Sequence, residues 1–291
     1  MKPTSFDYVR AETLSDVFAV LAAHGDNARI LAGGQSLIPA MAMRLAVPEI
    51  LIDIAGLADL RRLEVVDGRL RIGALCRHAE LLDAVEVEEH APLIARALPH
   101  IAHPAIRNRG TIGGSLCHAD PAAELPACAL ALDASFDIQG PSGQRTVTAL
   151  EFFQGIYSTN LRKDEILLSI DVPMMEPTGL CFFDEFARRQ GDYAMAGLAA
   201  GAAVEDERLT HVRLAFFAIG ATPIRAMKAE QILEGAAIAD IDAVADTVST
   251  AIADEIEPFD DLTTSSGAKL AMMQVLARRA LAAFVDQGAL P

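Results

Sequence analysis

Two glycine-rich stretches contain the residue types that can hold an anionic ligand. Residues 30–37 read ILAGGQSL, and residues 107–126 read RNRGTIGGSLCHADPAAELP. Glycine lets backbone N–H groups approach a ligand closely and adopt conformations that side chains disfavour. Successive N–H groups in such a turn form an anion-binding concavity, and a following helix N-terminus adds positive potential. Because hydroxyl side chains flank both glycine pairs, the pattern predicts a ligand with a diphosphate.

The spacing of these glycines disfavours the commonest nucleotide-binding folds. A Rossmann turn has G-x-G-x-x-G at the start of a helix and an acidic residue about 20 positions later. The first stretch reads A-G-G-Q-S-L instead, although Asp53 follows at a suitable distance. A P-loop requires Gly-Lys-Ser/Thr, which the chain lacks. One glycine pair often does no more than turn the chain, so the prediction rests on the two stretches together.

Composition limits the partners and the chemistry of the chain. A net charge of −16 over 291 residues disfavours binding to nucleic acid or anionic membranes, so a phosphate is expected to depend largely on backbone dipoles. The four cysteines, Cys76, Cys117, Cys128 and Cys181, match no zinc or iron–sulfur spacing and are expected to be reduced thiols. No metal site or acid–base catalytic residue is assigned. The polar N-terminus and the lack of a long apolar run predict a cytoplasmic protein without a membrane span.

The elements expected to position the two stretches indicate an α+β fold. Residues 1–55 are predicted to contain a helix at 13–24, a strand at 29–32, a helix capped by Ser36 and a strand at 50–54. Alternating runs predict hairpins at 61–74 and 135–148 and a strand at 165–172. Helices are predicted at 78–84, 91–100 and 121–132, and residues 152–161 are predicted to be mostly loop. After a turn-rich boundary at 174–179, three antiparallel strands (181–187, 194–205, 209–219) and three helices (226–234, 241–252, 268–286) are expected.

Together these motifs resemble a known family of flavoproteins. Ala32–Gly33–Gly34–Gln35–Ser36 and Thr111–Ile112–Gly113–Gly114–Ser115 are similar to the paired glycine motifs of the FAD-binding medium subunits of molybdenum hydroxylases, of the carbon monoxide dehydrogenase type. The segments around RNRGTIGG, HADPAAELP and EILLSIDVP are also similar, so the resemblance covers essentially the whole chain. It implies a two-lobed FAD-binding domain of the vanillyl-alcohol-oxidase-like type at residues 1–175, with lobes at 1–55 and 56–175. Residues 176–291 would form the family's C-terminal domain, with a three-stranded sheet and helices.

The resemblance also implies which residues contact FAD. The diphosphate and ribityl chain would lie against the two motifs, sugar hydroxyls near the acidic residues, the adenine or isoalloxazine near Leu161, and the flavin face against Tyr193. The implied set is Ile30, Leu31, Ala32, Gly33, Gly34, Gln35, Ser36, Leu37, Thr111, Ile112, Gly113, Gly114, Ser115, His118, Asp120, Glu124, Leu161 and Tyr193. The chain departs from the family pattern at Ser115, where Asn is frequent, at Glu124, where Asp is common, and near Glu185, where relatives often have Lys.

The function implied by the resemblance is electron transfer. Electrons would reach FAD from the 2Fe–2S clusters of a small partner subunit and pass to an external acceptor, while a large molybdenum-cofactor subunit hydroxylates the substrate, in a dimer of heterotrimers. Two other functions remain open from the residues alone: a self-sufficient FAD-dependent oxidase or dehydrogenase, and a non-enzymatic nucleotide-binding module. The resemblance implies that the hydroxylated substrate is selected in another subunit.

Overall fold

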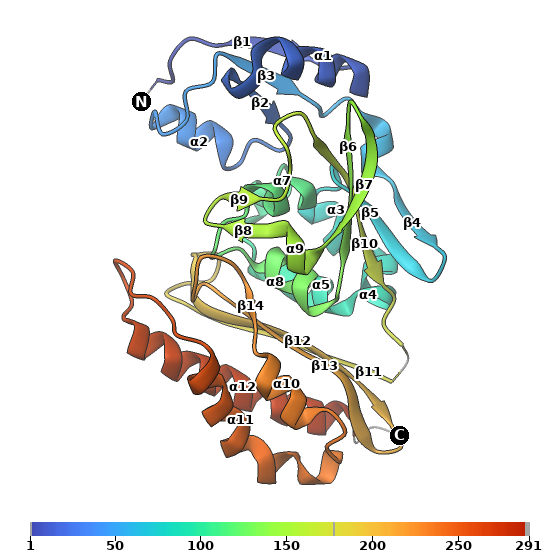
Figure 1. The fold of residues 1–291 in the computed structure, drawn as a ribbon, viewed down its shortest axis with the longest axis vertical. Helices are drawn as coiled ribbons and strands as arrows, with labels where there is room; N and C mark the ends of the chain where they lie inside the picture. Colours follow the sequence, from blue (N-terminus) through green and yellow to red (C-terminus); the bar gives the residue numbers. More distant parts are fainter. Residues whose placement is uncertain (1, 177, 289–291) are drawn as a thin grey trace.

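The computed structural model describes residues 2–176 and 178–288, and Figure 1 shows three parts stacked along its long axis. The small lobe at the top is a parallel three-stranded sheet in the order β1 (Asp7–Arg10), β3 (Ile50–Asp53), β2 (Ala28–Leu31). Helix α1 (Leu14–His24) packs on this sheet, and Thr13 and Asp16 cap it reciprocally. The short 3-10 helix η1 (Gly25–Asn27) leads into β2, and α2 (Leu37–Ala42) follows it. Strand β1 was not predicted, because its four residues are mostly exposed and show no apolar run.

The larger lobe is built on a five-stranded antiparallel sheet. Its order is β4 (Leu63–Val66), β5 (Arg69–Gly73), β10 (Ile166–Pro173), β6 (Ser135–Gly140), β7 (Gly143–Thr148). The outer pairs β4–β5 and β6–β7 are the two predicted hairpins, and β10 joins them. The lobe's helices are η2 (Ala58–Arg61), α3 (His78–Leu82), α4 (Val85–His90), α5 (Pro92–Ala97), η3 (Leu98–His100), α6 (Pro104–Arg107), α7 (Ile112–His118), α8 (Glu124–Ala131) and α9 (Ala149–Phe152).

Three local predictions for this lobe were wrong. The second glycine pair was expected in a turn ahead of a helix, but Gly113 and Gly114 lie within the first turn of α7, and the short helix α6 precedes them. The expected loop at 152–161 contains a small hairpin, β8 (Phe153–Gly155) and β9 (Ser158–Thr159). Helix α8 begins at Glu124, three residues later than predicted, because Ala123 N–H closes a turn on Asp120 O.

The last part is an antiparallel sheet covered by helices. Strands β11 (Gly179–Ala187), β12 (Ala194–Glu205) and β13 (Arg208–Phe217) are the three predicted strands. The prediction of three strands was incomplete, because β14 (Ile224–Arg225) pairs with β13 and makes a fourth. Helices α10 (Met227–Leu233), η4 (Ile238–Asp240), α11 (Ile241–Glu255) and α12 (Ser266–Gly288) complete this part.

This sheet is buried on both faces, which ties the two halves of the chain together. Helices α5 and α8 of the larger lobe pack on one face, and α10 and α12 pack on the other (Figure 1). Successive side chains of a strand point to opposite faces. Accordingly, Phe183 and Phe217 join the core of the larger lobe, while Leu214 and Phe216 join the core under the helices. The α+β class is confirmed, and the C-terminal sheet shares a core with the part that contains the glycine motifs.

Candidate cofactor site

The two glycine motifs meet through their backbones. A Cβ atom placed on Gly33 would lie 2.2 Å from the carbonyl oxygen of Arg109 and 2.8 Å from Cα of Gly110. Gly34 has φ 72°, in the left-handed region where glycine is favoured. Because the atoms that a Cβ on Gly33 would meet belong to the backbone, only glycine fits at that position. The exit of β2 and the entry to α7 lie in direct contact although 75 residues separate them.

The first motif supplies the free backbone donors. Within the described parts of the chain, the N–H groups of Gly33, Gly34, Gln35 and Ser36 donate to no acceptor. The side chain of Gln35 donates to the carbonyl of Gly33, which fixes the loop, and the Ser36 hydroxyl does not cap α2 as predicted. Successive unpaired N–H groups ahead of a helix are donors of the kind that bind phosphate oxygens.

The second motif differs, because the fold itself uses its N–H groups. Ile112 and Gly113 donate to the carbonyls of Cys76 and Ala74, at 3.0 and 2.9 Å. Gly114 donates to Thr111 Oγ1, the N-cap of α7, at 3.1 Å. This corrects the prediction that the backbone of both motifs is available to a diphosphate. The glycines of the second motif carry no side chain, so a ligand can approach its backbone closely. The Ser115 hydroxyl is also available to a ligand, since it makes no hydrogen bond to the described residues.

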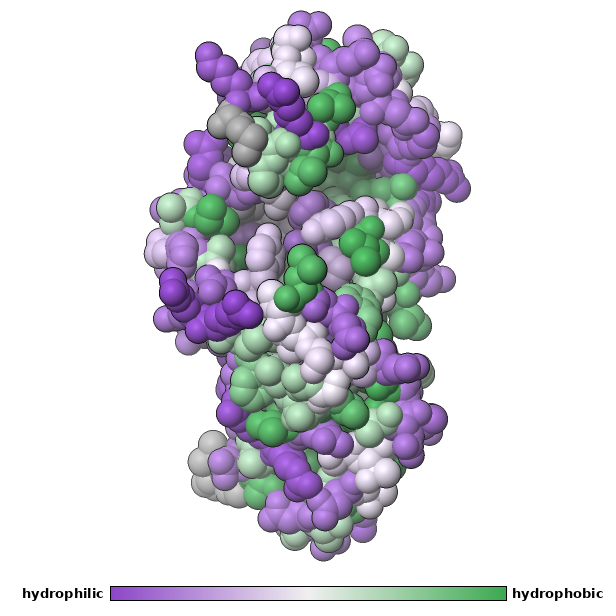
Figure 2. All heavy atoms as spheres, turned by 90° about the vertical axis from the view of Figure 1, so that its left-hand side faces the viewer, coloured by the Kyte–Doolittle hydropathy of each residue, from purple (hydrophilic) through white to green (hydrophobic). Residues whose placement is uncertain are grey.

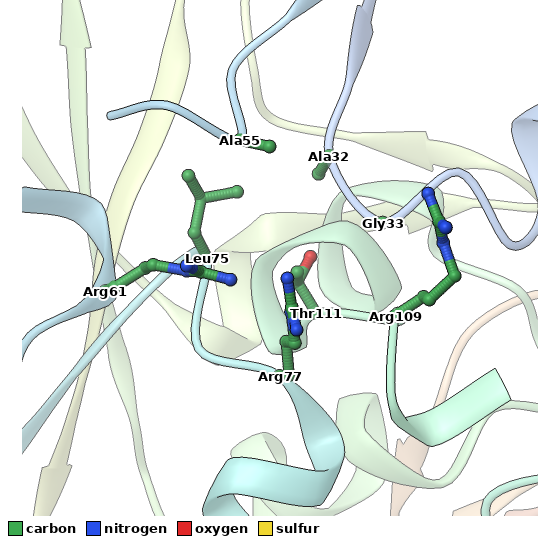
Figure 3. A pocket seen from close by; sticks show the side chains of 8 residues that line it. All are labelled: Ala32, Gly33, Ala55, Arg61, Leu75, Arg77, Arg109 and Thr111. Carbon is green, nitrogen blue, oxygen red and sulfur yellow. The ribbon is translucent and has the colours of Figure 1, made fainter. Parts of the chain in front are cut away.

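Three arginines converge beside this junction. A cavity of about 190 Å³ is lined by Ala32, Gly33, Ala55, Arg61, Leu75, Arg77, Arg109 and Thr111 (Figure 3). Arg61 lies 3.9 Å from Glu80, whereas Arg77 and Arg109 pair with no carboxylate in the described ranges. The net charge, from which a phosphate was expected to depend largely on backbone dipoles, did not indicate these local cations. Arg107 acts structurally, since it donates to the carbonyls of Ile101 and Ala102.

Sequence reasoning had no means of finding Arg61 and Arg77. They come from the end of η2 and from the residue before α3, far from either glycine motif in the sequence. Neither lies in a recognisable pattern. Only the packing of the two lobes brings them to Gly33.

Aromatic rings gather beyond the C-terminal end of α7. The rings of His118 and Tyr157 stack with centroids 4.8 Å apart. Tyr157 stands at the tip of the β8–β9 hairpin with φ 53° and donates its N–H to the carbonyl of Ala119. Partial desolvation, and after it the charge of Asp120, raises the pKa of the Tyr193 phenol, so Tyr193 also lies near this group. Two of the three tyrosines of the chain therefore flank Asp120, and Tyr157 was missed because its hairpin was expected to be loop.

The remaining predicted residues surround these groups. Leu161 is partly buried against the core of the larger lobe, shortly after β9. Glu124 starts α8, and Asp120 accepts the N–H of Ala122 at 2.9 Å. Figure 2 shows the side of the molecule on which α2, α7 and β9 lie in Figure 1, hollowed between the small lobe and the larger lobe.

Within residues 2–176 and 178–288, no group of three metal-ligating side chains comes together, and no helix is long and apolar enough to cross a membrane.

Comparison with known proteins assigns the chain to a family. Residues 4–175 match the FAD binding domain in molybdopterin dehydrogenase, and residues 181–284 match the CO dehydrogenase flavoprotein C-terminal domain. The chain is 38% identical to the nicotine 6-hydroxylase medium subunit of Paenarthrobacter nicotinovorans, over 99% of each chain. It is 36% identical to the carbon monoxide dehydrogenase medium chain of Hydrogenophaga pseudoflava, over 97% of each chain.

A solved structure agrees over the same length. The carbon monoxide dehydrogenase from Hydrogenophaga pseudoflava that lacks the Mo-pyranopterin moiety matches with a TM-score of 0.95 and 36% identity, over 99% of each chain. The match extends through the glycine motifs, the C-terminal sheet and its helices. The chain therefore belongs to the FAD-binding medium subunits of the molybdenum hydroxylase family, of the carbon monoxide dehydrogenase type: it is an oxidoreductase subunit whose cofactor is FAD.

Proposed function

We propose that this chain relays electrons within a complex of three kinds of subunit. FAD would receive electrons from the 2Fe–2S clusters of a small partner subunit and deliver them to an external acceptor. A large molybdenum-cofactor subunit would carry out the substrate hydroxylation, in a dimer of heterotrimers. The full-length likeness to medium subunits of dehydrogenase complexes supports this assignment. Bound FAD supplies the redox chemistry, and this chain supplies binding, orientation and electrostatics.

The observation that carries the proposal is the donor set at the junction of the two motifs. The unpaired N–H groups of residues 33–36 fit the diphosphate, which needs several donors and little bulk. Arg61, Arg77 and Arg109 raise the electrostatic potential at the same junction in an acidic chain. Hydroxyls of Ser36 and Ser115 provide additional polar contacts, and Ser115, although shorter than Asn, both donates and accepts.

The other parts of the cofactor follow from this placement. Asp120 suits sugar hydroxyls, because an ionised carboxylate accepts hydrogen bonds. Tyr193, with His118 and Tyr157 nearby, suits the face of a flat tricyclic ring. Leu161 provides an apolar contact for one of the ring systems. We place the FAD-binding domain at residues 1–175, with lobes 1–55 and 56–175, and the C-terminal domain at 176–291.

The test is to purify the chain and record its visible absorption spectrum before and after adding FAD. Flavin bands, or tight uptake of FAD, are the expected result. The partner assignment is tested separately, by co-expression with the adjacent genes and native mass spectrometry. Recovery of the chain without a large molybdenum subunit and a small cysteine-rich subunit, under conditions in which both are produced, would refute the partner assignment.

A further inference from the structure

The connection between β13 and β14 holds an alanine in a conformation that side chains disfavour. Ala218 follows directly on β13, is 6% exposed and has φ 61°, in the left-handed region that favours glycine. Its N–H donates to the carbonyl of Pro121 at 2.8 Å. Backbone strain of this kind persists only where the surrounding structure fixes it, and it is frequent near ligand sites. Ala218 is therefore expected to be held through both of its backbone polar groups.

A buried lysine provides the second of these contacts. Lys269, in the first turn of α12, is 1% exposed, and its Nζ donates to the carbonyl of Ala218 at 2.7 Å. Asp261 lies 2.7 Å from the same nitrogen, and the centroid of the Phe259 ring lies 4.9 Å from it. Phe259 also donates its N–H to the carbonyl of Ile219 at 3.1 Å. Two successive carbonyls of the connection are thus held by the start of α12 and the segment that leads into it.

Stability alone does not account for a lysine at this position. Burying an ammonium group carries a large desolvation cost, and a buried ion pair is often no more stabilising than apolar side chains of the same volume. An apolar side chain, however, cannot donate a hydrogen bond. Hydrogen bonds are directional, whereas the hydrophobic effect is not, so the donor of Lys269 fixes the carbonyl of Ala218 in one place.

The other end of these contacts is the turn that follows α7, residues 119–123. Pro121 at its centre supplies the carbonyl that accepts the N–H of the strained alanine, and Asp120 Oδ1 accepts a backbone N–H two residues later, at 2.9 Å. Tyr157 donates its N–H to the first carbonyl of the turn at 3.1 Å, and its ring stacks on His118. In Figure 1, α12 begins on the left, the side on which α7 and β9 also lie. The turn therefore carries Asp120 and adjoins the aromatic rings assigned above to the cofactor.

We propose that Lys269 is a positioning residue for the cofactor, which acts through the backbone of Ala218 to fix the turn that presents Asp120 to FAD. The inference rests on the proposed FAD site and deepens it. Hydrogen bonds run from the ammonium group to the carbonyl of Ala218, and from the N–H of the same residue to Pro121. A shift at either step moves the turn, and with it the carboxylate that accepts from sugar hydroxyls. The C-terminal domain thereby contributes to FAD binding through a residue that lies in neither glycine motif.

The test compares two substitutions in α12. Lys269→Met keeps a long unbranched side chain but removes the donor to Ala218. Phe284→Leu is the matched control, because Phe284 is fully buried in the core under the helices, about 22 Å further along α12. This control weakens the packing of the same helix but removes none of the hydrogen bonds described here. Both variants are expected to lower the Tm, and only Lys269→Met is expected to change the FAD site.

The first readout needs no cofactor. Hydrogen–deuterium exchange of the FAD-free chain is followed by mass spectrometry, at a temperature at which both variants are folded. In Lys269→Met, peptides that contain residues 119–123 or Ala218 should exchange about tenfold faster, the value of one lost hydrogen bond. In Phe284→Leu, the same peptides should exchange at the wild-type rate. Unchanged exchange in Lys269→Met, or equal acceleration in both variants, overturns the proposal.

The second readout is the bound cofactor. The Kd for FAD should rise about tenfold in Lys269→Met, because the displaced carboxylate loses one hydrogen bond to the ligand. The visible circular dichroism of the bound flavin should also change, since this signal depends on the groups around the ring, whereas Phe284→Leu should match the wild type in both measurements. A wild-type Kd and spectrum in Lys269→Met refute the inference while leaving the FAD site intact. If the wild type itself binds no FAD, the proposed function fails, and the inference fails with it.

Discussion

Replacing Gly33 by Ala tests whether the two glycine motifs are in contact. The added Cβ would meet the carbonyl oxygen of Arg109 at 2.2 Å, Cα of Gly110 at 2.8 Å and the carbonyl carbon of Arg109 at 2.9 Å. All three atoms belong to the backbone, so no side chain can rotate away to relieve the clash. The small lobe must shift from the entry of α7, which separates the residues expected to hold the diphosphate.

The size of the effect follows from overpacking. Inserting a methyl group into a closely packed contact typically costs about 1–3 kcal/mol. At roughly 2–4 °C per kcal/mol for a chain of this size class, the Tm should fall by several degrees. FAD affinity should fall by more than the stability change alone implies, because the shift displaces the four unpaired N–H groups together.

The matched control is Gly267→Ala. Gly267 lies in the first turn of α12, and a Cβ placed there would meet no atom within 4 Å. Removing backbone freedom from the unfolded chain without strain stabilises by about 0.4–1 kcal/mol, so this variant should match or slightly exceed the wild-type Tm. Thermal unfolding and FAD titration by flavin fluorescence measure both quantities. A Gly33→Ala variant with wild-type Tm and wild-type Kd for FAD would refute the contact and the ligand placement that depends on it.

Three further predictions follow from other parts of the chain. Tyr193→Ala should retain FAD but weaken its binding by up to about tenfold, the value of one aromatic contact, and should change the rate of flavin reoxidation in stopped-flow experiments; unchanged kinetics and affinity would remove Tyr193 from the site. Glu230→Gln should lower the free energy of unfolding by about 3–5 kcal/mol, because buried Glu230 accepts hydrogen bonds from Leu214 N–H and from Arg225. A loss of less than about 1 kcal/mol in urea denaturation would contradict this. Lys269 is 1% exposed, and its hydrogen bond to Asp261 is the largest cause that holds the pKa of that carboxyl well below its usual range. The ionised carboxylate therefore stabilises the fold above its unfolded pKa, and this contribution is lost as the pH falls through the folded pKa. Asp261→Asn should lower the Tm near neutral pH and should make the Tm less dependent on pH in the acid range. Curves of Tm against pH that run parallel for the two proteins would rule this out.

Much of the fold follows from local patterns in the sequence. The predicted hairpins form because alternating side chains with a turn pair such as Asp67–Gly68 favour paired strands regardless of distant residues. The α+β class and the three long C-terminal strands were also readable. Four short strands were not: β8, β9 and β14 have only two or three residues each, and β1 forms mainly because β3 offers it a partner.

The identity of the family was likewise contained in the sequence, in two glycine motifs of the right composition and order. What the sequence left open is which atoms of those motifs are free. In the second motif, N–H groups donate to the carbonyls of Ala74 and Cys76 and to the Thr111 hydroxyl, so only the first motif keeps four unpaired donors. That distribution depends on partners supplied by other segments, which no local pattern records.

The sequence by itself determined the motifs, the fold class and the cofactor of this protein. Only the tertiary structure brought three arginines to Gly33 and paired Glu185 of β11 with His100 of the larger lobe. The physical reason is that backbone conformation is encoded mainly by neighbouring residues, whereas the charge, burial and proton of a side chain are set by whatever the packed lobes bring against it.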